Sequence, residues 1–220
     1  MKIKKYLHSC VVLEENGKRL MFDPGAFVFI ENQLKPEDIG PVDVIVITHS
    51  HPDHYFPEAL KALQALHPFT LVASEEIIKF AQDEAGLECA VEYATPGEVK
   101  NIEGFSIQAF DVPHERIPVS CPHNMGYKIN DAVYHPGDSY LVPASLGRVK
   151  VLLLPNGGPW ATTCQTVEFA KAVQPEIAVP IHDAVHKEFW LERLNNSMAG
   201  WMKDININYK ALAVAEELNI

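Results

Sequence analysis

The hydrophobic residues of this chain fall into short β-type runs separated by segments with helical spacing, an order typical of an α/β protein. Near the amino terminus, strands are predicted over residues 2–7, 11–14 and 19–22, and the last two flank the turn Asn16-Gly17. Asn-Gly is a strong hairpin signal, so these two strands are expected to pair. Residues 43–48 form a short apolar run of the kind that becomes a buried strand.

The rest of the chain continues this alternation. Pro57 opens a helix that runs to residue 66, and Ser74 is placed to cap a second helix that leads to residue 85. The tail, residues 209–220, fits either a short helix or an edge strand. The other predicted elements are strands at 69–73, around 99, at 105–112, 124–129, 132–135, 149–154 and 177–180, a helix at about 164–173, and a helix from about 186 whose end near Gly200 is not defined.

A similar pattern occurs in both halves of the sequence. Residues 20–25 follow the Asn-Gly hairpin, residues 132–137 follow a hairpin at Asn130-Asp131, and each then leads to strand, helix and strand. This pattern predicts a single domain, residues 1–220, with an internal duplication whose halves are roughly 1–110 and 111–220. Two such halves are expected to form two sheets packed face to face, with helices on the outer faces.

Metal-binding chemistry is concentrated directly after the strand predicted at 43–48, where the chain reads His49-Ser50-His51-Pro52-Asp53-His54. Alternate side chains of an extended segment share a face, so His49 and His51 can converge on one cation. Pro52 redirects the chain, which leaves Asp53 and His54 free to bind a second cation. Imidazoles with a carboxylate and without nearby cysteine favour an open, hydrolytic site for zinc, iron, nickel or manganese.

This segment matches the H-x-H-x-D-H motif, and the chain therefore resembles the metallo-β-lactamase superfamily. The resemblance implies an αββα sandwich of two mixed sheets and seven ligands for two divalent metal ions. The remaining three ligands are then expected in the order His, Asp, His. They are His114 beside His49 and His51 on the first metal, Asp138 as the bridging carboxylate, and His182 beside Asp53 and His54 on the second metal, with His123 as an alternative to His114.

The resemblance extends to one branch of the superfamily. The motifs His8-Ser9-Cys10, Phe22-Asp23-Pro24 and residues 134–138 and 154–158 are together similar to the compact branch related to L-ascorbate-6-phosphate lactonase. Pro136 and Ser139 differ from the residues that this branch more often carries there. The likeness implies a hydrolase of this kind and leaves its substrate open.

Composition and charge limit the kinds of partner and substrate that are expected for this protein. The 220 residues are 47% hydrophobic and 21% charged, as in an ordinary soluble globular domain, and the formal net charge is −11. That charge disfavours nucleic acid, while the metals themselves would still permit a small phosphorylated metabolite. The apolar runs are too short for a signal peptide or a membrane span, and the four dispersed cysteines favour free thiols, so a cytoplasmic protein is expected. The oligomeric state is not predicted.

The predicted function is a dinuclear metal-dependent hydrolase, with zinc as the first expectation, in which a metal-activated hydroxide attacks a small lactone or phosphoester. Asp53 or Asp138 would orient the hydroxide or carry its proton. His8, His135 and Tyr140 are candidate proton donors to the leaving group, with His8 first. The backbone N–H groups of residues 156–158 could face a developing oxyanion. Loops 27–38 and 117–123 are expected to set specificity.

Two other interpretations remain open at this stage. One is a mononuclear iron oxidoreductase resembling a sulfur dioxygenase on the same fold. The other is a non-catalytic binding protein, against which the intact set of ligands argues.

Overall fold

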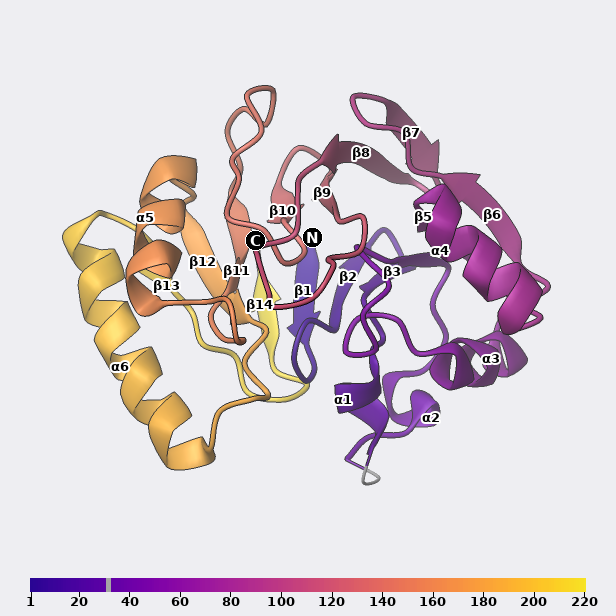
Figure 1. The fold of residues 1–220 in the computed structure, drawn as a ribbon, viewed down its shortest axis with the longest axis horizontal. Helices are drawn as coiled ribbons and strands as arrows, with labels where there is room; N and C mark the ends of the chain where they lie inside the picture. Colours follow the sequence, from indigo (N-terminus) through magenta and orange to yellow (C-terminus); the bar gives the residue numbers. More distant parts are fainter. Residues whose placement is uncertain (31–32) are drawn as a thin grey trace.

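Two seven-stranded mixed sheets pack face to face in the computed structural model, which describes residues 1–30 and 33–220 (Figure 1). Helices cover the outer face of each sheet, on the left and on the right of the view, which gives four layers in the order α, β, β, α. The predicted αββα sandwich is therefore confirmed.

The first sheet has the strand order β14-β1-β2-β3-β4-β5-β6. Strands β1 to β3 and β14 are antiparallel, and β3 to β6 are parallel. Asn16 and Gly17 both have positive φ, 51° and 76°, as a tight hairpin turn between β2 and β3 requires. The strands are β1 (Lys2–Lys5), β2 (Val11–Glu15), β3 (Lys18–Phe22), β4 (Val44–Val46), β5 (Thr70–Ala73), β6 (Ala90–Tyr93) and β14 (Glu217–Asn219).

The second sheet has the order β13-β12-β11-β10-β9-β8-β7. Here β7 to β10 are antiparallel and β10 to β13 are parallel. The turn between β9 and β10 again has two residues with positive φ, Asn130 and Asp131. The strands are β7 (Val99–Ile102), β8 (Phe105–Asp111), β9 (Met125–Ile129), β10 (Val133–His135), β11 (Val151–Pro155), β12 (Ile177–Ile181) and β13 (Asn208–Tyr209).

Two of the helices, α4 and α5, begin at a residue whose side chain accepts a hydrogen bond from a free N–H group of the first turn. The Ser74 hydroxyl accepts from the N–H of Ile77, as predicted, and Thr162 caps α5 in the same way. The last helix continues through Gly200, because Leu194, Met198 and Met202 bury its inner face. The helices are α1 (Ala26–Phe29), α2 (Pro36–Ile39), α3 (Pro57–Leu66), α4 (Glu75–Lys79), the π-helical turn η2 (Phe80–Glu84), α5 (Thr163–Val173) and α6 (Glu188–Asp204).

Three hydrophobic layers hold the four structural layers together. Between the sheets, inward-facing residues of both interdigitate, and Phe22 lies against Tyr127 with ring centroids 6.5 Å apart. Leu60 belongs to the layer between α3, α4 and the first sheet, and Phe169 belongs to the layer between α5, α6 and the second sheet. The strand ends are thereby held rigidly, which fixes the loops that follow them.

Several predicted boundaries shift in the structure. The first strand ends at Lys5, because residues 6–10 form a turn in which the N–H of Cys10 donates to the carbonyl of Leu7. The tail pairs with β1 as an edge strand, so the strand alternative is correct. Edge strand β6 was not predicted. Within the predicted loop 27–38 the structure has the one-turn helices α1 and α2, and residues 31–32 lie outside the described part. The duplication stays a prediction.

Among the described residues, no helix is both long and apolar enough to cross a membrane. The four cysteines, Cys10, Cys89, Cys121 and Cys164, are free, as expected.

Candidate metal centre

The seven predicted ligands meet where strand ends of the two sheets come together. Each ligand lies in a loop or turn directly after a strand, so the rigid sheets position the side chains. Residues 49–54 follow β4, His114 follows β8, Asp138 follows β10 and His182 follows β12, while His8 lies in the turn between β1 and β2. The side chains form two adjacent groups that could each hold a metal ion, His49, His51, His114 and Asp138 in one and His8, Asp53, His54 and His182 in the other.

Three imidazoles of the first group face one another. The Nδ1 atom of His51 lies 3.1 Å from Nε2 of His49 and 3.2 Å from Nε2 of His114. Oδ2 of Asp138 is 3.4 Å from Nε2 of His114 and 3.8 Å from that of His49. Ligands placed tetrahedrally at the zinc–nitrogen distance would be about 3.3 Å apart. The observed spacing therefore fits a divalent transition metal.

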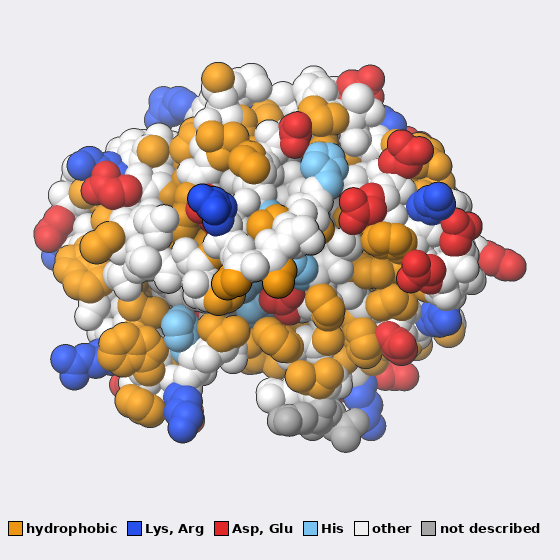
Figure 2. Space-filling view, viewed as in Figure 1, with side chains coloured by type: hydrophobic (Ala, Val, Ile, Leu, Met, Phe, Trp, Pro, Cys, Tyr) orange, Lys and Arg blue, Asp and Glu red, His pale blue; other side chains and the backbone are white. Residues whose placement is uncertain are grey.

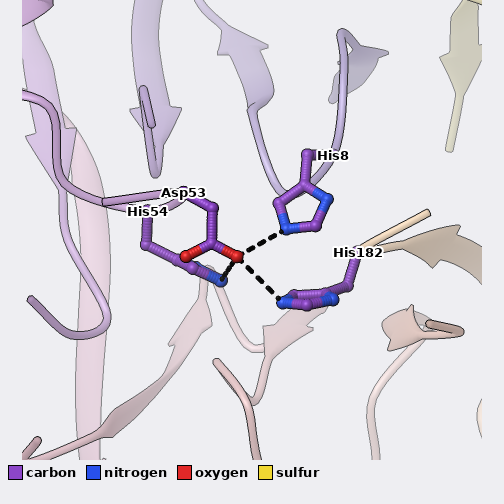
Figure 3. Close-up of side chains that lie close together, drawn as sticks. All are labelled: His8, Asp53, His54 and His182. Atoms are coloured by element: carbon purple, nitrogen blue, oxygen red, sulfur yellow. Dashed lines mark hydrogen bonds and ion pairs between the residues drawn. The ribbon is translucent and has the colours of Figure 1, made fainter. Parts of the chain in front are cut away.

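The second group surrounds the carboxylate of Asp53 (Figure 3). Its Oδ2 atom is 3.1 Å from Nε2 of His8, 3.5 Å from Nε2 of His182 and 3.9 Å from Nε2 of His54. His8 is fully buried, and its ring lies 4.0 Å from the ring of His182. His8, predicted as a proton donor, thus lies within hydrogen-bonding distance of the Asp53 carboxylate.

Asp138 lies between the two groups. Its Oδ1 is 3.2 Å from Nε2 of His54, and its Oδ2 is 3.0 Å from Nε2 of His182. The same Oδ2 faces His114 and His49 of the first group. One carboxylate therefore contacts ring nitrogens of both groups.

Buried polar atoms without hydrogen-bond partners lie between the two groups, and they indicate which kind of ligand the site can hold. Nε2 of His54, Nε2 of His182 and Oδ1 of Asp138 are buried and have no hydrogen-bond partner among the described residues. These atoms lie close to one another, but their geometry does not meet that of a hydrogen bond. Leaving such atoms unsatisfied costs about 1–3 kcal/mol each. A cation bound among them would remove this cost, so the residues fit divalent metal ions.

The histidines of the site differ in the direction in which their pKa values are shifted. Burial, followed by the charge of His54, holds the pKa of His49 well below its ordinary value. Burial also disfavours the charged form of His182, but the Asp138 carboxylate outweighs it and raises the pKa of His182 to about 9. For Asp138, burial opposes ionisation, yet the imidazoles of His54, His182 and His49 hold its pKa well below the ordinary range. Asp138 is thus a carboxylate, the form that binds a metal.

A supporting residue whose role the sequence did not reveal is Asp23, which directly follows β3. Its Oδ2 accepts from Nδ1 of His54 at 2.7 Å, while the N–H and hydroxyl of Thr48 donate to its two oxygens at 2.8 Å. Because Nδ1 of His54 carries the proton donated to Asp23, Nε2 is the ring atom directed toward Asp138, and it can bind a metal once it has lost its own proton. In the sequence Asp23 stood only within the motif Phe22-Asp23-Pro24, to which no role in the site was assigned.

His135 and Tyr140 lie away from the two groups. The N–H of Gly137 donates to Nδ1 of His135, whose Nε2 faces Asp23 at 3.5 Å, and its fully buried ring packs on Phe22. The Tyr140 hydroxyl bonds to Thr166 and to the carbonyl of residue 155. Neither side chain is directed at the ligands.

Two further predictions concern His123 and the loop of residues 156–158, here called the glycine loop. His123 is exposed, and its Nε2 lies 3.1 Å from Asp111, so the structure brings His114 rather than His123 to the first group. A Cβ atom on Gly158 would lie 3.1 Å from the ring of His182. The glycine loop therefore packs directly on that ring.

The fold and the two groups of ligands define a metal-dependent hydrolase class, and the comparisons place the chain within it. The model of the family described as "Beta-lactamase superfamily domain" matches residues 2–182, so the chain belongs to this superfamily. It is a metal-dependent hydrolase of that family, and the resemblance read from the sequence is confirmed at this level. The narrower likeness to the lactonase branch stays a prediction.

Individual relatives agree with this placement. Protein Rv0786c of Mycobacterium tuberculosis is 31% identical over 194 residues, 84% of this chain and 85% of the relative. A UPF0173 metal-dependent hydrolase of Aeropyrum pernix is 30% identical over 202 residues, 80% of this chain and 79% of the relative. Among solved structures, Igni18, a metallo hydrolase from Ignicoccus hospitalis, has the same fold with a TM-score of 0.69 and 21% identity, covering 99% of this chain and 97% of that one.

Proposed function

We propose that this protein is a dinuclear metal hydrolase. The first metal would be held by His49, His51 and His114, and the second by Asp53, His54 and His182, with Asp138 shared between them. The observation that supports this arrangement is the position of the Asp138 carboxylate, whose oxygens lie 3.0–3.8 Å from ring nitrogens of both groups.

Bound divalent ions supply Lewis acidity and lower the pKa of water, and zinc is the first expectation. Side chains of the protein would then transfer the proton released by the attacking water. Asp53 is the more exposed of the two carboxylates, 20% against 3% for Asp138, so it can exchange protons with solvent. His8 lies 3.1 Å from Asp53, and burial lowers its pKa to about 4, so at neutral pH it is a neutral N–H donor to that carboxylate.

We assign proton transfer from the attacking water to the leaving group to Asp53, which His8 would hold in place through its N–H, and orientation of the attacking water to Asp138. His135 then acts as a positioning residue, because its Nε2 faces Asp23, which holds His54. The substrate is proposed to be a small metabolite of lactone or phosphoester type, and the enzyme to be cytoplasmic, as the free thiols favour.

The test is a metal titration of stripped protein with zinc and, separately, manganese. Hydrolysis of a panel of lactones and phosphoesters is expected to rise until two equivalents are bound. His49→Ala should abolish it, whereas His67→Ala, which removes an exposed histidine outside both groups, should not.

Other results would contradict the proposal. Full activity at one equivalent of iron with consumption of oxygen would indicate the oxidoreductase. Failure to bind any metal would indicate a non-catalytic binding protein.

A further inference from the structure

Trp160 lies against both groups of ligands. Its ring is 5.4 Å from the ring of His182 and 6.2 Å from the ring of His114, and both contacts are edge-on. These are contact distances for aromatic rings. The residue belongs to the loop between β11 and α5, yet it is only 8% exposed. One buried indole therefore borders the first group through His114 and the second group through His182.

The glycine loop brings the indole close to His182. A Cβ atom on Gly158 would lie 3.1 Å from Cε1 of His182 and 3.1 Å from Nε1 of Trp160, so the two rings meet beside this glycine. A Cβ atom on Gly157 would lie 2.5 Å from the carbonyl oxygen of His182. Gly158 also has a φ of 117°, which side chains rarely allow. Both glycines are thus needed for the loop to pack on His182.

Trp160 is itself fixed by other apolar side chains. Its ring is 5.2 Å from the ring of Tyr140, which in turn lies 5.4 Å from the ring of Phe169 on α5. Hydrophobic side chains also surround the histidine and acidic side chains that are visible in the hollow in Figure 2. In such close packing, removal of one aromatic ring leaves a gap into which its neighbours can move.

His182 depends on packing more than other ligands do. Its Nε2 faces Asp138 at 3.0 Å, while its Nδ1 is buried and has no hydrogen-bond partner among the described residues. Metal-binding histidines usually donate this second ring N–H to a fixed acceptor, which orients the ring. Three other buried ligand rings have a partner at Nδ1, namely Thr48 for His49 at 3.0 Å, Asp23 for His54 at 2.7 Å and the carbonyl of Glu115 for His114 at 2.5 Å. The ring of His182 instead contacts the rings of Trp160 and His8.

We infer that Trp160 is a positioning residue of the metal centre, whose indole holds the ring of His182 in the orientation that binds the second metal. The inference rests on the proposed function for the presence of the metals, and it adds a residue that is neither a ligand nor part of the proton transfer. Contact with the indole replaces the hydrogen bond that orients the other buried rings. His114 touches the same indole but keeps its bond to Glu115, so it depends on Trp160 less.

The first experiment is a double-mutant cycle on the affinity for cobalt, measured by competition with a chromophoric chelator. Trp160→Ala should weaken binding at the second group about 10- to 100-fold, the loss expected when a residue that orients a ligand is removed. In a His182→Ala background the same change should cause no further loss, because the ring that Trp160 holds is gone. An equal loss in both backgrounds would overturn the inference, since a general structural role does not depend on His182.

Two further variants control for the loss of a buried ring. Phe169→Ala removes a ring that is 3% exposed and belongs to the layer between α5, α6 and the second sheet. It should leave cobalt affinity within about twofold of the original protein. Trp160→Phe keeps an aromatic ring beside His182 and should lose less affinity than Trp160→Ala. A loss in Phe169→Ala as large as that in Trp160→Ala would overturn the inference.

Tryptophan fluorescence gives a second measurement that does not require Trp160→Ala to fold. The chain has three tryptophans, and Trp190 and Trp201 lie on α6, each 46% exposed. The variant Trp190→Phe/Trp201→Phe leaves Trp160 alone, and cobalt should quench most of its emission, whereas zinc should not. Trp160→Phe, which keeps the two tryptophans of α6, should lose a smaller fraction. Equal quenching in the two proteins would place Trp160 away from the metals.

These measurements need no substrate, so the inference and the proposed function can fail separately. Cobalt binding with the expected coupling to His182, but without hydrolysis of any substrate, would contradict the hydrolase and leave the inference intact. Hydrolysis with an unchanged cobalt affinity in Trp160→Ala would overturn the inference alone. Absence of metal binding would overturn both.

Discussion

The backbone N–H of His182 donates a hydrogen bond to the carbonyl oxygen of His8 at 3.2 Å, and both residues have left-handed φ, 58° and 59°. This bond joins the turn after β1 in the first sheet to the end of β12 in the second. The strained backbone places both rings side by side at the second group of ligands. The two halves of the candidate site are thus linked through the main chain as well as through any metal.

Replacing His8 tests this strained backbone. His8→Asn and His8→Val both remove the imidazole, but Asn tolerates left-handed φ and a β-branched residue does not. His8→Val should therefore lower the free energy of unfolding by about 1–2 kcal/mol more than His8→Asn. Urea unfolding of both metal-free variants measures the difference. Equal stabilities would show that the conformation at this turn relaxes freely.

Asp23 offers a test of ligand orientation. Asp23→Asn removes the carboxylate that accepts from Nδ1 of His54, so metal affinity of the second group should fall about 10- to 100-fold. Asp43→Asn is the matched control, because Asp43 accepts from the N–H of Arg19 far from the ligands. Competition with a chromophoric chelator gives both affinities. An unchanged affinity in Asp23→Asn would remove Asp23 from the metal centre.

Metal binding should release protons in a pH-dependent manner. The pKa of His182 is raised to about 9 by Asp138, and that of His54 is also raised, so near neutrality both rings must lose a proton to bind a metal. His49 and His51, whose pKa values are lowered, bind without this cost. Calorimetry in buffers of different ionisation enthalpy should find proton release near neutrality that declines as the pH passes 9. Equal release on both sides would contradict the assignment.

Gly25 is predicted to be essential for the shape of the ligand loop. A Cβ atom there would lie 1.8 Å from the carbonyl oxygen of Asp53, so Gly25→Ala must displace the backbone that carries Asp53 and His54. The free energy of unfolding should fall by about 1–3 kcal/mol, with at least a tenfold loss of metal affinity. Gly200→Ala, in open space on α6, should instead stabilise the protein by about 1 kcal/mol. Thermal unfolding and metal titration compare the two, and equal behaviour would show that the ligand loop tolerates displacement.

Local sequence signals predicted the elements that carry the ligands. The run before His49, the Asn16-Gly17 turn and the Ser74 cap each depend on neighbours a few residues away, and the structure has a strand, a hairpin and a helix there. The grouping of His114, Asp138 and His182 followed from the family motif. The structure places their side chains together.

Features set by distant contacts were not predicted. The tail could not be assigned, because its strand exists only through pairing with residues 2–4 at the other end of the chain. Strand β6 is an edge strand whose residues are half or fully exposed, so it lacks the alternation that would reveal it. The position of His135 behind Asp23, and the roles of both, depend on packing between strands that no local pattern encodes.

The central claim is that two metal ions share the Asp138 carboxylate, and an anomalous difference map from crystals grown with zinc tests it most directly. Two peaks are expected, one within about 2.0–2.2 Å of ring nitrogens of His49, His51 and His114, the other at the same distance from Asp53, His54 and His182. An Asp138 oxygen should contact both. A single peak, or metals bound elsewhere, would contradict the account.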